Sequence, residues 1–224
     1  MSRAQPLFSS VPPNLCQEQE LRACGYLYVA GVDEAGRGAW AGPVYAAAVV
    51  LPLDRPDLPA LLEGLRDSKQ LTPAQRETLY PLIRNVALAV GIGRAEVEEI
   101  NHLGILAATR RAMARAVAQL ERVDALLIDH LRLPEIPLPQ RPLPKADQRC
   151  LSVAAASVIA KVERDRRMAE LDREYPGYGF AAHKGYGTPR HRRALEQLGP
   201  SPIHRQTWRP IVLSAPQRAS HPSP

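Results

Sequence analysis

Two apolar runs joined by a very short link constrain the fold of this chain more than any other feature. YLYVAGVD, residues 26–33, and PVYAAAVVLP, residues 43–52, have the valine-rich and tyrosine-containing composition of strands. About nine residues join them, which is too short for a helical crossover between parallel strands. We therefore expect these two strands to pair antiparallel.

Helices and further strands alternate along the rest of the chain. A short helix is predicted over 72–85, with Thr72 as N-cap and Pro73 at the first helical position. Apolar runs predict strands at 86–95 and 124–130, and helical spacing of apolar residues predicts helices over 96–121, 150–174 and 188–199. The five prolines of 131–144 predict an extended loop. This order predicts an α/β fold with a mixed central sheet, its first three strands antiparallel and its later strands parallel, flanked by helices and followed by a helical C-terminal part.

The length of 224 residues suits one domain with irregular ends. Proline and serine dominate both termini, and such composition is typical of segments without a packed core. We expect a flexible N-terminal segment over 1–20, a single domain over 21–212 and a disordered tail over 213–224.

The charge of the chain favours a polyanionic partner. Its net charge is +6, and residues 183–209 hold six Lys or Arg and one Glu, a local charge of 6 − 1 = +5. A concentrated basic surface is a sign of nucleic-acid binding, because neutralising phosphates releases counterions. The three cysteines lack CxxC spacing, which argues against a zinc site and for a reducing compartment. Neither a membrane span nor a secretory signal is present, so we expect a cytoplasmic protein without membrane association.

Asp33 and Glu34 are the first candidate site residues. They lie where an apolar strand runs into the glycine-rich turn GRG, residues 36–38. Adjacent carboxylates in a protein repel one another, and a divalent cation relieves that repulsion. A solvated surface pair is the alternative, which the apolar and glycine-rich flanks weaken.

The stretch 36–41 also matches GxGxxA after a strand, a dinucleotide-binding pattern. That pattern requires a helix to follow, whereas Gly42 and Pro43 lead into another predicted strand. The carboxylate pair would also repel a pyrophosphate. A dinucleotide-dependent oxidoreductase is therefore disfavoured.

Two further acids complete a possible metal site. Asp129 ends a buried strand, where the alternative is a turn-starting aspartate, and Asp147 precedes a helix, where the alternative is a capping role. Asp165 is the other candidate for the fourth acid, although Lys161, Arg164 and Arg166 around it favour an ion pair. Four converging carboxylates could hold two Mg²⁺ or Mn²⁺ ions, and two such ions can activate a water and stabilise the leaving oxygen of a phosphodiester.

Six motifs in order resemble those of bacterial ribonuclease HII, the type 2 ribonuclease H family. The resemblance covers about residues 20–210 and rests on GVDEAGRG (31–38), DSKQLT (67–72), LLID (126–129), KAD (145–147), AAASVIAKVERD (154–165) and YGFAAHKGYGT (178–188). It implies a ribonuclease H-like fold and an endoribonuclease that requires Mn²⁺ or Mg²⁺. Its substrates would be RNA–DNA hybrids and duplex DNA containing single ribonucleotides, cut on the 5′ side of the ribonucleotide to leave a 3′-hydroxyl and a 5′-phosphate. The family resemblance also implies a monomer.

The resemblance also assigns roles to residues. The metal-binding catalytic acids would be Asp33, Glu34, Asp129 and Asp147. The backbone of Gly36, Arg37 and Gly38 would contact the ribose 2′-hydroxyl, the group that separates RNA from DNA. Tyr186 would stack on the sugar of the deoxynucleotide after the junction, and the expected phosphate contacts are Lys69 and Lys184.

The sequence departs from the family pattern beside two of the acids. His130 and Ala146 stand where the family usually has glycine. His130 could crowd the pocket or add a titrating group beside the metals, and the loop over 131–144 could alter local substrate contacts. Because no carboxylate is changed, we expect activity to survive. The related type 3 enzymes carry an extra N-terminal domain, and with roughly 25 residues before the first strand we expect no such domain here.

Overall fold

A five-stranded mixed sheet forms the centre of the molecule in the computed structural model, which describes residues 12–214. β1 (Val29–Ala35) pairs antiparallel with β2 (Val44–Val50), and β2 pairs antiparallel with β3 (Ala89–Ala95). β4 (Ala125–Asp129) adds parallel to the other side of β1. The predicted mixed sheet, with three antiparallel strands followed by parallel ones, is confirmed.

A fifth strand lies inside the segment predicted to be a loop. β5 (Gln140–Leu143) pairs parallel with β4 and completes the order β3-β2-β1-β4-β5. The prediction of a continuous loop over 131–144 is therefore wrong for these four residues. Pro142 is compatible with this strand because β5 lies at the sheet edge, where a missing N–H interrupts no inner ladder.

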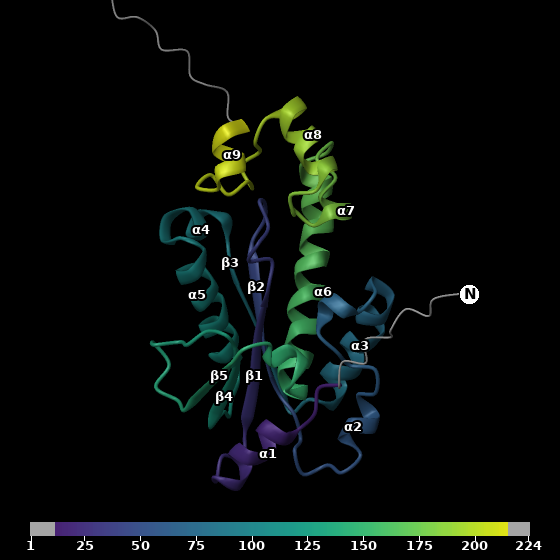
Figure 1. Ribbon diagram of the computed structural model, residues 1–224, viewed down its shortest axis with the longest axis vertical. Coiled ribbons are helices and arrows are strands. Elements are labelled where there is room, and N and C mark those ends of the chain that lie inside the picture. The colour runs from purple at the N-terminus through teal and green to yellow at the C-terminus, as the bar shows by residue number, and fades with distance from the viewer. Residues whose placement is uncertain (1–11, 215–224) are drawn as a thin grey trace, which may run out of the picture.

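Helices cover both faces of the sheet (Figure 1). The long helix α6 (Leu151–Glu174) packs on one face, and α4 (Val97–Leu103) and α5 (Ile105–Val117) lie on the other. Side chains alternate along β1, so Val29 joins the core on the α6 side and Val32 joins the core on the α5 side. The sheet is therefore enclosed between two apolar layers.

The strand β1 and the start of α6 approach each other closely at Gly31. A Cβ added there would lie 2.2 Å from the carbonyl carbon of Ser152. Only a glycine permits this approach, which fixes α6 directly against the strand that carries the first two candidate acids.

The helical segment predicted over 96–121 is interrupted. Gly104 adopts a positive φ of 78° between α4 and α5, and α5 ends at Val117. Positive φ is ordinary for glycine at the end of a helix. The apolar periodicity continues across this break because both helices pack on the same face of the sheet.

Helices extend into the inner parts of both segments that were predicted to be flexible or disordered. α1 (Cys16–Ala23) falls partly within the predicted flexible segment 1–20, and its Glu18 is fully buried. The Oε1 atom of Glu18 accepts hydrogen bonds from the backbone N–H and the hydroxyl of Ser152, which anchors α1 to the start of α6. α9 (Arg209–Ser214) likewise includes the first residues of the predicted tail. Residues 1–11 and 215–224 lie outside the described part of the chain.

Short elements connect these layers. α3 (Pro73–Val86) begins with the predicted Thr72 cap, which forms a capping box with Gln75. The remaining elements are α2 (Leu58–Leu61), η1 (Ser68–Gln70), η2 (Ala146–Gln148), α7 (Phe180–His183) and α8 (Pro189–Leu198). α7, α8 and α9 gather at one end of α6 around a separate apolar cluster (Figure 1). No helix within residues 12–214 is long and apolar enough to cross a membrane.

Candidate active site

The candidate acids are brought together by neighbouring strand ends. Val32 of β1 pairs with Ile128 of β4, so Asp33 and Asp129 follow side by side at the same edge of two parallel strands. Asp147 lies in η2, immediately after β5, and is 3% exposed. The Oδ1 atom of Asp129 accepts a hydrogen bond of 2.8 Å from the N–H of Ala146. This bond fixes η2 against β4 and holds Asp147 next to the strand ends.

Asp33 and Glu34 lack the full set of hydrogen-bond partners that buried carboxylates usually have. Asp33 is 3% exposed, and its Oδ1 accepts a 2.7 Å hydrogen bond from the N–H of Glu34. One oxygen of Glu34, Oε1, lies 3.1 Å from the guanidinium of Arg37. The other oxygen, Oε2, is buried without a hydrogen-bond partner. Buried polar atoms are rarely left in this state unless a ligand or ion completes them.

The electrostatics of these acids show mutual repulsion. Burial, and then the charges of Glu34, Asp129 and Asp147, raise the pKa of Asp33 well above its usual value. Burial also raises the pKa of Glu34. For Asp147, burial and then the charge of Asp67 raise the pKa to about 6. The cluster therefore favours a bound cation, which would stabilise the ionised carboxylates.

Asp67 is a fifth acid of the cluster that the sequence interpretation missed. It caps η1 by accepting a hydrogen bond from the N–H of Lys69, and it also accepts one from the side-chain amide of Gln148. Lys69 lies nearby, with its Nζ 3.5 Å from Oδ2 of Asp147 and 3.9 Å from Oδ1 of Asp67. Asp67 belongs to DSKQ, a motif already noted for its lysine, but nothing local to the sequence indicates its proximity to Asp147.

The turn after β1 is supported from a distant part of the chain. Gly36 has a positive φ of 91°, and a Cβ there would lie 1.8 Å from Nε of Arg164. Arg205, which is fully buried, donates hydrogen bonds to the carbonyl groups of Gly36, Arg37 and Gly42 at 2.7, 2.8 and 3.0 Å. The two buried arginines hold the shape of this turn, and sequence reasoning did not identify either of them as part of the site.

Tyr186 and Lys184 lie in a basic cleft together with Asp165. Two cations lie near the ring of Tyr186. Nζ of Lys161 is 5.6 Å from the ring centroid, and the guanidinium carbon of Arg164 is 5.4 Å from it. Lys184 adopts a left-handed backbone conformation, and its Nζ donates to the carbonyl of Asp165 at 3.3 Å. Arg164 touches both the Gly36 turn and this cleft, so it connects the two groups of candidate substrate contacts.

Asp165 has cationic partners of its own. Its carboxylate lies 2.6 Å from Nζ of Lys161 and 3.6 Å from the guanidinium of Arg76. This agrees with the ion-pair interpretation, although the group is 15% exposed rather than at the surface. Asp147, surrounded by other acids, is the better candidate for the fourth metal ligand.

The donor set fits a hard divalent cation. It consists of carboxylate oxygens, which Mg²⁺ and Mn²⁺ prefer over the nitrogen and sulfur ligands typical of zinc. The Oε2 atom of Glu34 has no hydrogen-bond partner, so this oxygen is available to coordinate a cation. Within residues 12–214, no group of three or more His, Cys, Asp or Glu side chains stands in a geometry that already holds a metal ion.

Comparisons with known proteins identify the family. The model of the family described as ribonuclease HII matches residues 30–211. The ribonuclease HII of Chloroflexus aggregans is 56% identical over 201 residues, which make up 89% of this chain and 95% of that protein. The crystal structure of ribonuclease H2 from Pyrococcus horikoshii is similar with a TM-score of 0.70 and 30% identity, over 84% of this chain and 96% of that one. The ribonuclease HII in a PCNA complex from Archaeoglobus fulgidus is similar with a TM-score of 0.70 and 29% identity, over 81% and 95% of the two chains.

The family match over residues 30–211 spans nearly the whole described structure, including the acidic cluster and every strand apart from the first residue of β1. They agree with the fold, which has the mixed sheet and flanking helices expected of a ribonuclease H. The chain therefore belongs to the ribonuclease HII family and is a ribonuclease H, an enzyme that cleaves nucleic acid endonucleolytically.

Proposed function

We propose that this enzyme cleaves the RNA strand of RNA–DNA hybrids and nicks duplex DNA on the 5′ side of single embedded ribonucleotides. The products would carry a 3′-hydroxyl and a 5′-phosphate. The observation that carries the proposal is the pairing of β1 with β4, which sets Asp33 beside Asp129 directly next to the Gly36 turn. The proposed site for hydrolysis and the proposed backbone surface for reading a sugar would then be contiguous along one strand.

Members of this family depend on divalent metal ions. Asp33, Glu34, Asp129 and Asp147 would hold two Mn²⁺ or Mg²⁺ ions during catalysis, which is supported by their mutual repulsion and by the unpartnered Oε2 of Glu34. When bound, such ions supply an activated water and stabilise the leaving oxygen. The carboxylates themselves fix where the scissile phosphate sits relative to the turn. Lys69 would contact a phosphate of the substrate, which the 75% exposure of its side chain beside Asp147 supports.

Discrimination between RNA and DNA is assigned to two elements that Arg164 connects. The turn over Gly36, Arg37 and Gly38 would contact the 2′-hydroxyl through its backbone, and glycine permits the close approach that this requires. Tyr186 would stack on the sugar of the deoxynucleotide after the junction, and Lys184 would contact a phosphate beside it. Their common basic cleft supports this assignment.

A nicking assay tests the proposal. The substrate is a DNA duplex with one ribonucleotide and labelled ends, compared with the same duplex containing only deoxynucleotides, each with Mn²⁺, Mg²⁺ or EDTA. We expect one cut on the 5′ side of the ribonucleotide with either metal, and no cut in EDTA or in the all-deoxy duplex. Asp33→Asn should abolish the cut because a neutral amide is a poor ligand for a hard cation. Asp165→Asn is the matched control, and it should retain the cut.

The same assay separates the alternatives. Binding of the duplex without a nick in either metal would instead indicate a nucleic-acid-binding protein that has lost hydrolysis. Unchanged turnover in Asp33→Asn would refute the assignment of the metal site.

We also propose that the enzyme acts as a monomer in the cytoplasm. Cys16, Cys24 and Cys150 are free thiols, as expected in a reducing compartment. Light scattering at micromolar concentration measures the oligomeric state directly, and a dimer mass would refute the monomer.

A further inference from the structure

Three buried histidines lie in the C-terminal apolar cluster, away from the acids. The backbone N–H of Ser201 donates a 2.8 Å hydrogen bond to Nδ1 of His204, so this nitrogen carries no proton. Nε2 of His204 therefore has the proton and donates to Nε2 of His191, 3.0 Å away. Nδ1 of His191 in turn donates to the carbonyl of Tyr186 at 3.0 Å. Ser201, His204, His191 and Tyr186 form one directed chain of hydrogen bonds, which we call the histidine chain.

His183 holds the other side of the same turn. The N–H of Gly185 donates to its Nδ1 at 3.2 Å, and its Nε2 donates to the carbonyl of Tyr178 at 2.8 Å. The His183 ring stacks on that of His191, with centroids 4.4 Å apart and planes 12° from parallel. The backbone on both sides of Tyr186 is thus fixed by a stacked pair of imidazoles.

The histidine chain is made of neutral rings. Burial lowers the pKa of His191 and His204 to about 4, and each ring has one donating and one accepting nitrogen in the chain. The hydrogen bonds of the histidine chain all run in one direction, and both rings are fully buried. This fixes the tautomer and the orientation of each ring, because the other tautomer would leave a buried donor or acceptor unpaired.

Arg205, the residue after His204, supports the Gly36–Gly38 turn, which is the other proposed contact with the junction. Arg205 donates to the carbonyls of Gly36 and Arg37, as described above, and its N–H donates to the carbonyl of Trp40 at 2.8 Å. The N–H of Trp40 donates to the carbonyl of Gly185 at 2.8 Å. The segment 203–205 therefore contacts the Gly36 turn directly and the Tyr186 turn through His191.

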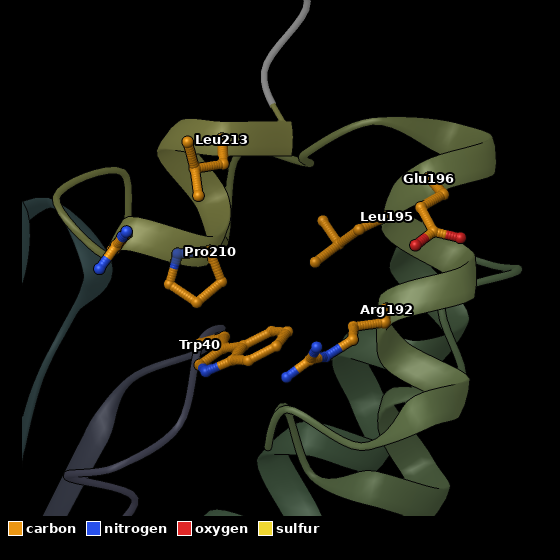
Figure 2. A pocket seen from close by; sticks show the side chains of 7 residues that line it. Trp40, Arg192, Leu195, Glu196, Pro210 and Leu213 are labelled. Carbon is orange, nitrogen blue, oxygen red and sulfur yellow. The ribbon is translucent and has the colours of Figure 1, made fainter.

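Trp40 lies between these turns. Its ring faces the guanidinium of Arg192 from α8, whose carbon is 5.5 Å from the ring centroid, in a pocket also lined by Pro210 of α9 (Figure 2). A Cβ on Gly187 would lie 2.2 Å from the same ring. One side of the indole thus packs against the chain after Tyr186, which restricts a shift of that chain relative to the turn after β1.

We propose that His191 and His204 are positioning residues that hold Tyr186 in register with the Gly36–Gly38 turn, so that recognition of the RNA–DNA junction depends on the histidine chain. The inference rests on the proposed function, because it takes Tyr186 as the residue that contacts the sugar after the junction. Hydrolysis itself does not require the chain, since neither histidine contacts any of the acids. The measurable quantity is the junction preference, defined as kcat/KM for duplex DNA with one ribonucleotide divided by kcat/KM for a continuous RNA–DNA hybrid.

Two substitutions of His191 separate its two hydrogen bonds. His191→Asn places an amide nitrogen where Nδ1 donates to Tyr186, whereas His191→Gln places an amide oxygen where Nε2 accepts from His204. We expect His191→Asn to keep the junction preference within about twofold and His191→Gln to lower it about fivefold, the effect of one neutral hydrogen bond. Equal losses in both variants, or no loss in either, would overturn the proposal.

A second pair of variants repeats the test from the far end of the histidine chain. His204→Gln retains a donor toward His191 and loses the acceptor for Ser201, and His204→Asn does the opposite. We expect His204→Gln to keep the junction preference. We expect His204→Asn to lower it about fivefold, because the imidazole of His191 then loses the donor that fixes its tautomer, whereas the amide nitrogen of His191→Asn donates to Tyr186 without help from position 204. The reverse order would mean that His204 only stabilises the turn at Ser201, and it would overturn the proposal even if the His191 variants fail to fold.

Leu195→Ala is the matched control for stability. Leu195 is buried in the same cluster on α8 but belongs to neither the histidine chain nor the site. Its substitution should lower the thermal midpoint and leave the junction preference unchanged, and a loss equal to that of His191→Gln would refute the positioning role. If the unaltered enzyme cleaves hybrids but fails to nick a single ribonucleotide, the proposed function and this inference both fail. If it nicks and all four histidine variants keep its preference, only this inference fails.

Discussion

Asp33→Asn should make the metal-free enzyme more stable while it removes activity. Asp33 is 3% exposed and accepts one hydrogen bond, from the N–H of Glu34 at 2.7 Å. Asparagine keeps this bond through its own Oδ1, and its new N–H groups face neighbouring carboxylates that can accept them. The substitution therefore removes a buried charge without removing a hydrogen bond.

The expected gain is about 2 kcal/mol. Burial and three nearby acids all disfavour the ionised form of Asp33, and removing a buried charge that lacks a cationic partner relieves a penalty of that order. For a chain of this length, this corresponds to a rise in Tm of roughly 4–8 °C in EDTA. In Mn²⁺ we expect the unaltered enzyme to have the higher Tm. An ion that binds only the folded state stabilises it, and the variant lacks one of the carboxylates that would hold the ion.

Thermal unfolding of both proteins in EDTA and in Mn²⁺ measures this double effect. Asp165→Asn is the control, because the same chemical change there breaks the 2.6 Å ion pair with Lys161 and should cost about 2 kcal/mol instead of adding stability. The reasoning is refuted if Asp33→Asn is no more stable than the unaltered enzyme in EDTA. It is also refuted if Mn²⁺ raises the Tm of both proteins equally.

Three further predictions concern acid stability, substrate reading and packing. The pKa values of His191 and His204, lowered to about 4 by burial, lie below the unfolded value of about 6.5, so the unfolded state binds protons first as the pH falls. Stability should therefore be intact above about pH 6.5 and decline toward pH 4, by up to about 3 kcal/mol for each histidine; urea unfolding at pH 7 and pH 5 measures this, and a flat profile contradicts it. Tyr186→Ala should reduce nicking at single ribonucleotides more than cleavage of hybrids, and equal loss on both substrates would argue against its reading role. Gly31→Ala should destabilise the fold by about 3 kcal/mol, because its Cβ would lie 2.2 Å from the backbone of Ser152; a urea midpoint unchanged from that of the parent would contradict this close approach.

The sheet could be predicted because its determinants are local. The link between β1 and β2 is too short for a crossover, and the apolar runs that form β1 to β4 are bounded by glycine or charged residues. β5 lacked such a signal, since its four residues include Pro142 and gain their strand conformation from pairing with β4. The interruption at Gly104 was missed because helices on both sides of it bury residues in the same core.

The candidate site also contains residues with a local sequence signal and residues without one. Asp33 and Asp129 could be predicted because each ends an apolar strand, and parallel neighbours place their carboxyl ends together. Arg205 could not, since it acts on the carbonyl of Gly36, a residue 169 positions away. His191 and His204 appeared in the sequence only as members of a basic region, yet both are fully buried and act through hydrogen bonds to backbone groups.

His130 shows how a departure from a family pattern can have a backbone cause. The sequence suggested a side chain that crowds the pocket or titrates beside the metals, but the side chain is exposed and the residue has a positive φ of 61°. Glycine adopts that conformation freely, whereas a residue with a Cβ pays roughly 1 kcal/mol for it. The N–H of His130 donates to the carbonyl of Leu143, which ties the end of β4 to the end of β5, just before η2 carries Asp147 back to the site. A glycine, which the sequence resemblance leads one to expect here, would suit the same turn, and this chain forms the turn with a histidine in the left-handed conformation.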